Sequence, residues 1–187
     1  MESTVLMEKK IMSVRTTLTA FALLAATPAF AHVTLEQREA PVGASYKIVL
    51  RVPHGCEQSA TTKLTVQIPE GVISVKPMVK AGWIIDVKRG AYAKPYSFLH
   101  GAKFTEGPKA ITWSGGNLPD AFYDEFVISI YLAGELTAGE TLYFPVVQEC
   151  EKGAHHWTEV PSPAKPGEKL GSPAPGLKLL PKAKVHE

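Results

Sequence analysis

Residues 125–132 read Glu-Phe-Val-Ile-Ser-Ile-Tyr-Leu, and every second side chain in this stretch is strongly apolar. Phe126, Ile128, Ile130 and Leu132 share one face of an extended chain, because successive side chains of a strand point to opposite sides. This period of two predicts a β-strand that buries one face in a core and leaves the other wet.

Similar alternation recurs on both sides of this stretch. The candidate strands are residues 46–52, 61–68, 84–87, 110–113 and 141–147. Turn signals rich in Gly and Pro separate them, at 53–55, 69–71, 81–82, 114–117 and 138–139. No window carries a sustained helical period with caps at both ends. The sequence therefore predicts an all-β fold, an immunoglobulin-like or cupredoxin-like antiparallel β-sandwich.

The start of the chain has the pattern of an export signal. Basic residues precede a short apolar run at 18–26, and Ala29-Phe30-Ala31 follows. The small residues Ala29 and Ala31 form the pattern that signal peptidase reads, so residues 1–31 are predicted to be a cleaved signal peptide. A membrane anchor is the alternative, but the run is shorter than the ~20 apolar residues of a spanning helix. The mature chain is expected to begin at His32.

The remaining residues suit one domain of ordinary size. We assign residues 32–160 to the sandwich and residues 161–187, which are rich in proline, to a tail that packs on the domain or trails from it. The formal net charge of +2 predicts neither nucleic-acid nor anionic-lipid binding. No segment after residue 31 is apolar enough to cross a membrane, so no integral membrane segment is expected after cleavage.

The chain has two cysteines, Cys56 and Cys150, and both follow the predicted cleavage site. Exported chains meet oxidising conditions, so the simplest prediction is one disulfide between them. The alternative is a copper site built from thiolates, although these soft ligands suit Cu(I) better than the oxidised ion.

His32 would gain a special chemistry as the first residue of the mature chain. Its α-amine and its imidazole Nδ1 can both donate to one metal ion and form a chelate. Nitrogen-rich, tetragonal ligand sets suit Cu(II), and a carboxylate would complete such a site and offset its charge. The alternative is an accidental histidine at a frayed terminus.

Several short motifs occur in a characteristic order. They include His-Val-Thr-Leu at 32–35, Val-Pro-His-Gly-Cys at 52–56, Tyr-Asp-Glu-Phe at 123–126, Phe-Pro-Val-Val-Gln-Glu-Cys at 144–150 and Trp-Thr-Glu-Val-Pro at 157–161. In these motifs the chain resembles the YcnI-like domain family over nearly all of its mature length. The resemblance implies a β-sandwich outside the cytoplasmic membrane, here in the periplasm, and a copper transporter or periplasmic copper chaperone as partner.

The resemblance also implies a copper site of the monohistidine-brace type. His32 matches the N-terminal histidine, and Trp157 matches the tryptophan beside it. For the carboxylate, Glu125 is the first choice and Glu159 the second. The neighbouring pair His155-His156 is a further candidate, but adjacent strand residues point to opposite faces, so both cannot easily bind one ion.

Enzyme motifs do not stand out in this sequence. It has no Gly-rich phosphate loop, no G-x-S-x-G elbow and no H-E-x-x-H helix, so we expect a binding protein for Cu(II) and not an enzyme. Two alternatives stay open. One is an adhesive β-sandwich without metal, and the other is an oxidative enzyme that uses a histidine brace.

Overall fold

The computed structural model of the protein describes residues 32–165 and 167–183. The predicted signal peptide, residues 1–31, lies outside these residues. The described chain folds into strands, with one short 3-10 helix at Leu99–Gly101. The strands are β1 (Thr34–Leu35), β2 (Glu39–Pro41), β3 (Ala44–Val52), β4 (Thr61–Gln67), β5 (Val72–Pro77), β6 (Ile84–Ser97), β7 (Lys103–Leu118), β8 (Asp124–Leu132), β9 (Thr141–Tyr143), β10 (Val146–Cys150), β11 (Ala154–Trp157) and β12 (Gly176–Leu180).

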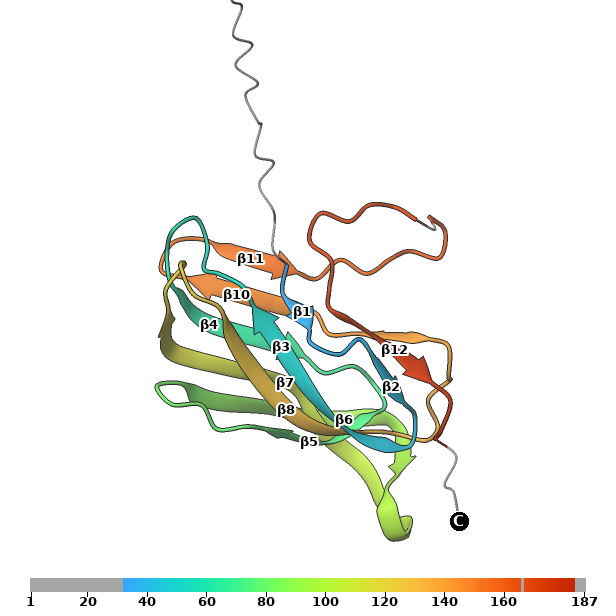
Figure 1. Cartoon of the computed structure of the whole chain (residues 1–187). Coiled ribbons are helices and arrows are strands. Elements are labelled where there is room, and N and C mark those ends of the chain that lie inside the picture. The colour runs from blue at the N-terminus through green and yellow to red at the C-terminus, as the bar shows by residue number, and fades with distance from the viewer. Residues whose placement is uncertain (1–31, 166, 184–187) are drawn as a thin grey trace, which may run out of the picture. The chain divides into compact units, whose positions relative to one another are not determined.

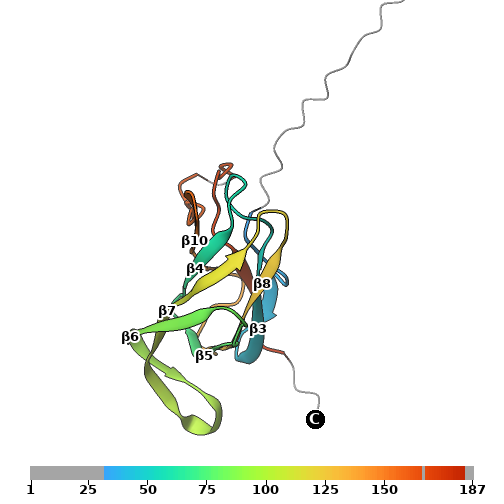
Figure 2. The same cartoon turned by 90° about the vertical axis from the view of Figure 1, so that its left-hand side faces the viewer.

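Two antiparallel sheets form the body of the molecule. The first has the order β1-β3-β8-β5, and the second has the order β11-β10-β4-β7-β6. Figure 2 shows them edge-on as two layers, with β3 and β8 in one and β10, β4 and β7 in the other. A small third sheet, β2-β12-β9, includes one parallel pair, β12 with β2. The predicted all-β sandwich is confirmed.

The stretch at 125–132 forms most of β8 and behaves as its alternation predicts. Phe126, Ile128, Ile130 and Leu132 are all buried, and the sheet pairs them with β3 in continuous antiparallel register. The opposite sheet meets this face with residues that are also fully buried, namely Leu64, Val66, Ile111 and Trp113. The core therefore lies between the inner faces of the two sheets, as expected for a sandwich.

The turn predicted at 114–117 is wrong. These residues continue β7. Strands β6 and β7 form a long hairpin, and both are much longer than the strands predicted at 84–87 and 110–113. Gly115 has φ of +76°, and the ladder to β4 shifts register nearby, which is typical of a bulge that a glycine absorbs. A Cβ on Gly116 would collide with the ring of Trp83, so this glycine lets the indole lie on the strand. The glycines here serve packing and not a chain reversal.

The predicted tail contributes to the core. Residues 176–180 form β12, in which Leu177 and Leu179 are almost fully buried. The strand lies between β2 and β9 and so closes one flank of the sandwich (Figure 1). The fold therefore extends past residue 160. Prolines at 173 and 175 precede this strand and do not interrupt its ladder, because β12 begins after them.

Cys56 and Cys150 form the predicted disulfide, with their Cα atoms 5.9 Å apart. It joins the loop after β3 to the end of β10. The two residues are 94 positions apart in the sequence, so the bond closes a long loop of the unfolded chain.

We expect the double substitution Cys56→Ser/Cys150→Ser to lower the free energy of unfolding by about 4 kcal/mol, because the unfolded chain regains the entropy of that loop. Urea unfolding of the oxidised protein and of the variant measures this difference. Alkylation without reductant of protein produced in an oxidising compartment should label neither cysteine. Two labelled thiols, or equal stabilities, would contradict the expectation.

Candidate functional site

His32 and Trp157 meet where two sheet edges come together. His32 lies two residues before the start of β1, an edge of the first sheet, and Trp157 ends β11, an edge of the second. Their ring centroids lie 5.2 Å apart, with the ring planes tilted by 56°. Trp157 is only 3% exposed, so its indole is a fixed wall beside a partly exposed imidazole. Two predicted site residues, from opposite ends of the domain sequence, are thus in contact.

Gln148 holds the indole of Trp157 in place. The Trp157 Nε1–H donates to Gln148 Oε1 at 3.0 Å. The Gln148 amide nitrogen donates to the carbonyl of His54 at 2.7 Å and to Thr61 Oγ1 at 2.8 Å. Gln148 is 1% exposed, and these bonds use its carbonyl oxygen and both amide hydrogens. The indole N–H is therefore occupied, and the ring is fixed as it faces His32.

Sequence reasoning did not single out Gln148. Its signal lies in the alternation of residues 146–150, where Val146 and Gln148 both fall on the buried side of β10. A polar side chain at a core position of a strand needs buried partners. In this protein the buried polar residue is Gln148, and it holds the indole of Trp157 in place.

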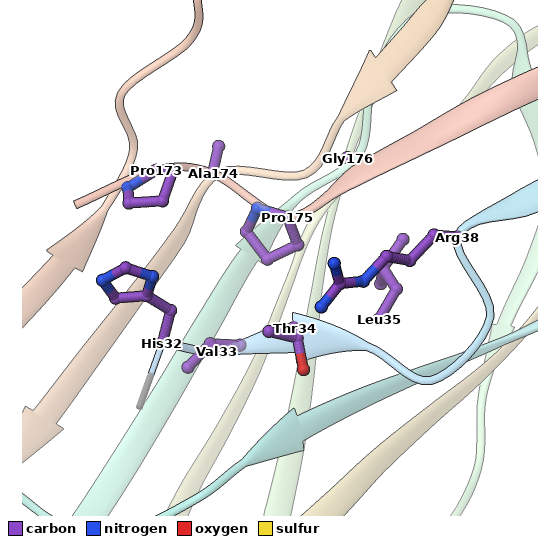
Figure 3. Close-up of a pocket in the computed structure, with 9 residues that line it drawn as sticks. All are labelled: His32, Val33, Thr34, Leu35, Arg38, Pro173, Ala174, Pro175 and Gly176. Carbon is purple, nitrogen blue, oxygen red and sulfur yellow. The ribbon is translucent and has the colours of Figure 1, made fainter. Parts of the chain in front are cut away.

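Two hollows flank His32. One has a volume of about 240 Å³ and extends under Pro173 and Pro175 toward Arg38. Figure 3 shows the His32 ring below Pro173, with the Arg38 guanidinium at the far side of the hollow. Space thus exists beside the imidazole for an ion with its bound water.

The second hollow, of about 290 Å³, is lined by His32, Thr34, Arg51, Pro53 and Tyr123. The Arg51 guanidinium carbon lies 5.6 Å from the centre of the Tyr123 ring. Arginines therefore line the hollows on both sides of the imidazole. A metal ion bound between these two cations would need an anionic ligand to offset the repulsion.

Glu125 lies on the far side of Arg51 from β1. The register pairs Thr34 with Arg51 and Arg51 with Glu125, so the three form one row across β1, β3 and β8. Arg51 Nε is 3.5 Å from Glu125 Oε1, and both side chains are more than one third exposed. Such an exposed ion pair contributes little stability and can open at small cost.

Glu159 links two segments of the chain through hydrogen bonds. Its Oε2 accepts a hydrogen bond of 2.8 Å from the Ser172 backbone N–H, and its own backbone bonds to Ser172 and Ala174. It thereby fastens the chain after β11 to the loop before β12. This loop includes Pro173, which lines the hollow beside His32. Glu159 is near the site but is committed to this loop.

His155 and His156 lie on opposite faces of β11. His155 lies on the same face of β11 as Trp157, and their ring centroids are 5.0 Å apart. His156 points the other way and is exposed. Burial of its ring lowers the pKa of His155 below the ordinary histidine value, and the nearby His54 lowers this pKa further.

The central feature of this site is the His32 imidazole beside the buried indole of Trp157. Within residues 32–165 and 167–183, the His32 ring forms no hydrogen bond. In that same part of the chain, no three His, Cys, Asp or Glu side chains gather closely enough to hold a metal.

The family profile described as "Domain of unknown function (DUF1775)" matches residues 32–179. The chain belongs to this family. The YcnI-like family named by the motifs is the same DUF1775 family, so that expectation is confirmed, while its copper chemistry is a separate matter. The match ends within β12, in agreement with the core role of that strand.

A solved structure supports the fold of this DUF1775 domain. The chain is 29% identical to an uncharacterized protein from Nocardia farcinica whose crystal structure has an immunoglobulin-like fold. The similarity covers 80% of this chain and 98% of that one, with a TM-score of 0.58. No curated protein matches the chain. Among the described residues of this DUF1775 chain, no helix has the length and apolar character needed to cross a membrane.

We expect Gln148→Leu to destabilise the DUF1775 domain by about 2–3 kcal/mol, because the buried Trp157 N–H loses its acceptor and the His54 carbonyl loses its side-chain donor. The indole N–H signal of Trp157 in a nitrogen-15 correlation spectrum should shift, and its hydrogen should exchange faster. Gln67→Leu is the matched control, because Gln67 is exposed on β4, and it should change stability by less than about 0.5 kcal/mol. Equal effects of the two substitutions would refute the role of Gln148.

Proposed function

We propose that this protein is exported and that its mature chain, starting at His32, binds one Cu(II) ion in copper homeostasis or trafficking. The observation that carries the proposal is the His32 imidazole, free of hydrogen bonds within the described residues, against the fixed face of Trp157. The Ala29-Phe30-Ala31 pattern in front of His32 supports cleavage at this point. The family similarity also begins at His32.

Cleavage would turn one side chain into two ligands. The new α-amine has a reference pKa near ~8, far below that of a lysine, so it gives up its proton to a metal readily. Amine and imidazole on the same residue form a chelate, and only one residue has to be ordered to supply both donors. Nitrogen ligands of this kind favour Cu(II) among the common divalent ions.

The surroundings of His32 support a site that is shaped but open. Gln148 holds Trp157 on one side of the imidazole, and Pro173 lines the hollow on another side. The hollows on either side leave access for an ion and for a partner that delivers or removes it. Such access suits copper as a cargo, and the proposal assigns it no catalytic role.

Glu125 is the better candidate for the carboxylate. It lies next to Arg51, which lines the hollow that also contains His32, and its ion pair with Arg51 is long and exposed. Glu159 would have to release the Ser172 N–H at 2.8 Å and loosen the segment that leads into Pro173. The periplasm is the proposed compartment, and a copper transporter or copper chaperone is the proposed partner.

The decisive experiment compares Cu(II) binding by protein that begins at His32 with binding by two variants. One is His32→Ala, and the other carries ten Gly and Ser residues before His32, which places the terminal amine out of reach of its imidazole. We expect both to weaken Cu(II) binding at least a hundredfold in competition with a chelator, and to change the spin-resonance spectrum. His100→Ala, at an exposed turn of the β6–β7 hairpin, is the control and should bind normally.

Intact-mass analysis of the exported protein has to show a chain that begins at His32, and a retained Ala31 would defeat the proposal. Unchanged Cu(II) affinity in both variants would do the same. If the mature protein takes up no copper at all, the adhesive alternative gains. Oxidation of a substrate that depends on reductant and copper would favour the enzyme alternative.

Two isosteric substitutions separate the carboxylates. We expect Glu125→Gln to weaken Cu(II) binding at least tenfold, about 1.4 kcal/mol, because the site loses the charge that offsets the ion. Glu159→Gln keeps an oxygen for the Ser172 N–H and should change affinity less than threefold. Arg51→Gln should strengthen binding, because it frees Glu125 and removes a nearby cation. A larger loss in Glu159→Gln than in Glu125→Gln would reverse the assignment.

A further inference from the structure

Four aromatic rings form a continuous row from the start of β1 to the loop after β3. The ring centroids of His32 and Trp157 are 5.2 Å apart, those of Trp157 and His155 are 5.0 Å apart, and those of His155 and His54 are 6.4 Å apart. Trp157 thus lies between His32 and a second pair of histidines. That second pair plays no part in the proposed Cu(II) chelate.

The His54 ring is oriented so that one nitrogen stays free. Its Nδ1 lies 2.6 Å from the carbonyl oxygen of Gly55 and 3.9 Å from Asp120 Oδ1. Both neighbours are acceptors, so the proton of a neutral ring belongs on Nδ1 and the lone pair on Nε2. Histidines that bind metals commonly have this arrangement, in which the second nitrogen donates to a carbonyl or a carboxylate.

The two histidine rings have a spacing that suits a shared ion. The His54 and His155 rings are nearly perpendicular, at 88°. Ring nitrogens bind copper-like ions at about 2.0–2.1 Å, so two imidazoles that share one ion have ring centres about 5–6 Å apart. The observed 6.4 Å needs only a small closure. The side chain of His54 is 32% exposed and can make that movement.

Strand β10 holds both histidine backbones. The His54 carbonyl accepts a hydrogen bond from Gln148, and two residues later Cys56 is joined to Cys150 at the end of β10. His155 pairs with Gln148 in the ladder between β10 and β11. Two ligands whose backbones are both fastened to one strand lose little entropy when they bind an ion.

We propose that His54 and His155 form a second binding site, for a divalent transition-metal ion of the class that imidazole ligands prefer, with Cu(II) as the probe. Asp120 orients the His54 ring and contributes a negative charge nearby. Water completes the coordination, because the site supplies two protein ligands. The site does not depend on cleavage before His32, and so it goes beyond the proposed function and can stand without it.

The test uses the His32→Ala protein, from which the terminal chelate is absent. On titration with Cu(II), the imidazole proton signals of His54 and His155 should broaden before those of His100 and His156. Adding His54→Gln or His155→Gln should each weaken Cu(II) binding at least tenfold. His156→Gln is the matched control, since His156 is adjacent in sequence but exposed on the opposite face, and it should change affinity less than twofold.

Two results would overturn the second site. One is that neither His54→Gln nor His155→Gln reduces the Cu(II) affinity of the His32→Ala protein, or that this protein binds no Cu(II) at all. The other is an equal loss in His156→Gln. Near-ultraviolet circular dichroism of each variant verifies folding, and because the two ligands lie on different segments, either variant alone tests the site. If the His54–His155 site is refuted, the proposal of Cu(II) binding at His32 still stands. If Cu(II) binding at His32 is refuted, the test of the His54–His155 site still holds.

Discussion

The packing of the apolar face of β8 against the second sheet is the contact on which the rest of the structure depends. Phe126 lies at its centre, with its ring 5.3 Å from that of Trp113 and 5.0 Å from that of Trp83. Both pairs are edge-to-face arrangements, which aromatic rings prefer. A shift of β8 by one residue would turn Phe126 and its alternate neighbours outward, so this face fixes the register of the sheet. The outer strand β1 takes its position from the same sheet, because it pairs with β3, which pairs with β8.

A second, polar constraint operates at the edge of this core. Gln148 is buried on β10 and bonds to Trp157, to Thr61 and to the backbone at His54. A buried amide that lost these partners would leave several polar groups unpaired, so the network allows one arrangement only. It ties the loop after β3, strand β4 and strand β11 to the same point. The Cys56–Cys150 bond reinforces this link nearby.

These two constraints explain why histidines collect at one end of the sandwich. The edge strands bring His32 to Trp157, and the network behind Trp157 brings the His54 loop toward His155. The His32 ring is thereby held beside Trp157, and the His54 ring is held close enough to His155 for a small movement to let both bind one ion. A protein that receives copper at one end of such a row and holds a second ion at the other would have two adjacent sites of different ligand type. His32 would bind as a chelate, and the histidine pair through imidazoles alone.

Local patterns in the sequence determined the sandwich class, the buried face of β8, the pairing of the only two cysteines, the family and the place of His32 before the first strand. Each of these depends on residues close together in the chain or on composition. The contact of His32 with Trp157, the buried role of Gln148 and the approach of His54 to His155 were decided by the tertiary structure. The same holds for β12 and for the long β7, where Gly116, part of a pattern that signals a turn, instead makes room for Trp83. Such contacts join residues that lie far apart in the chain, and their geometry depends on how two sheets pack and in which register, which no local pattern encodes.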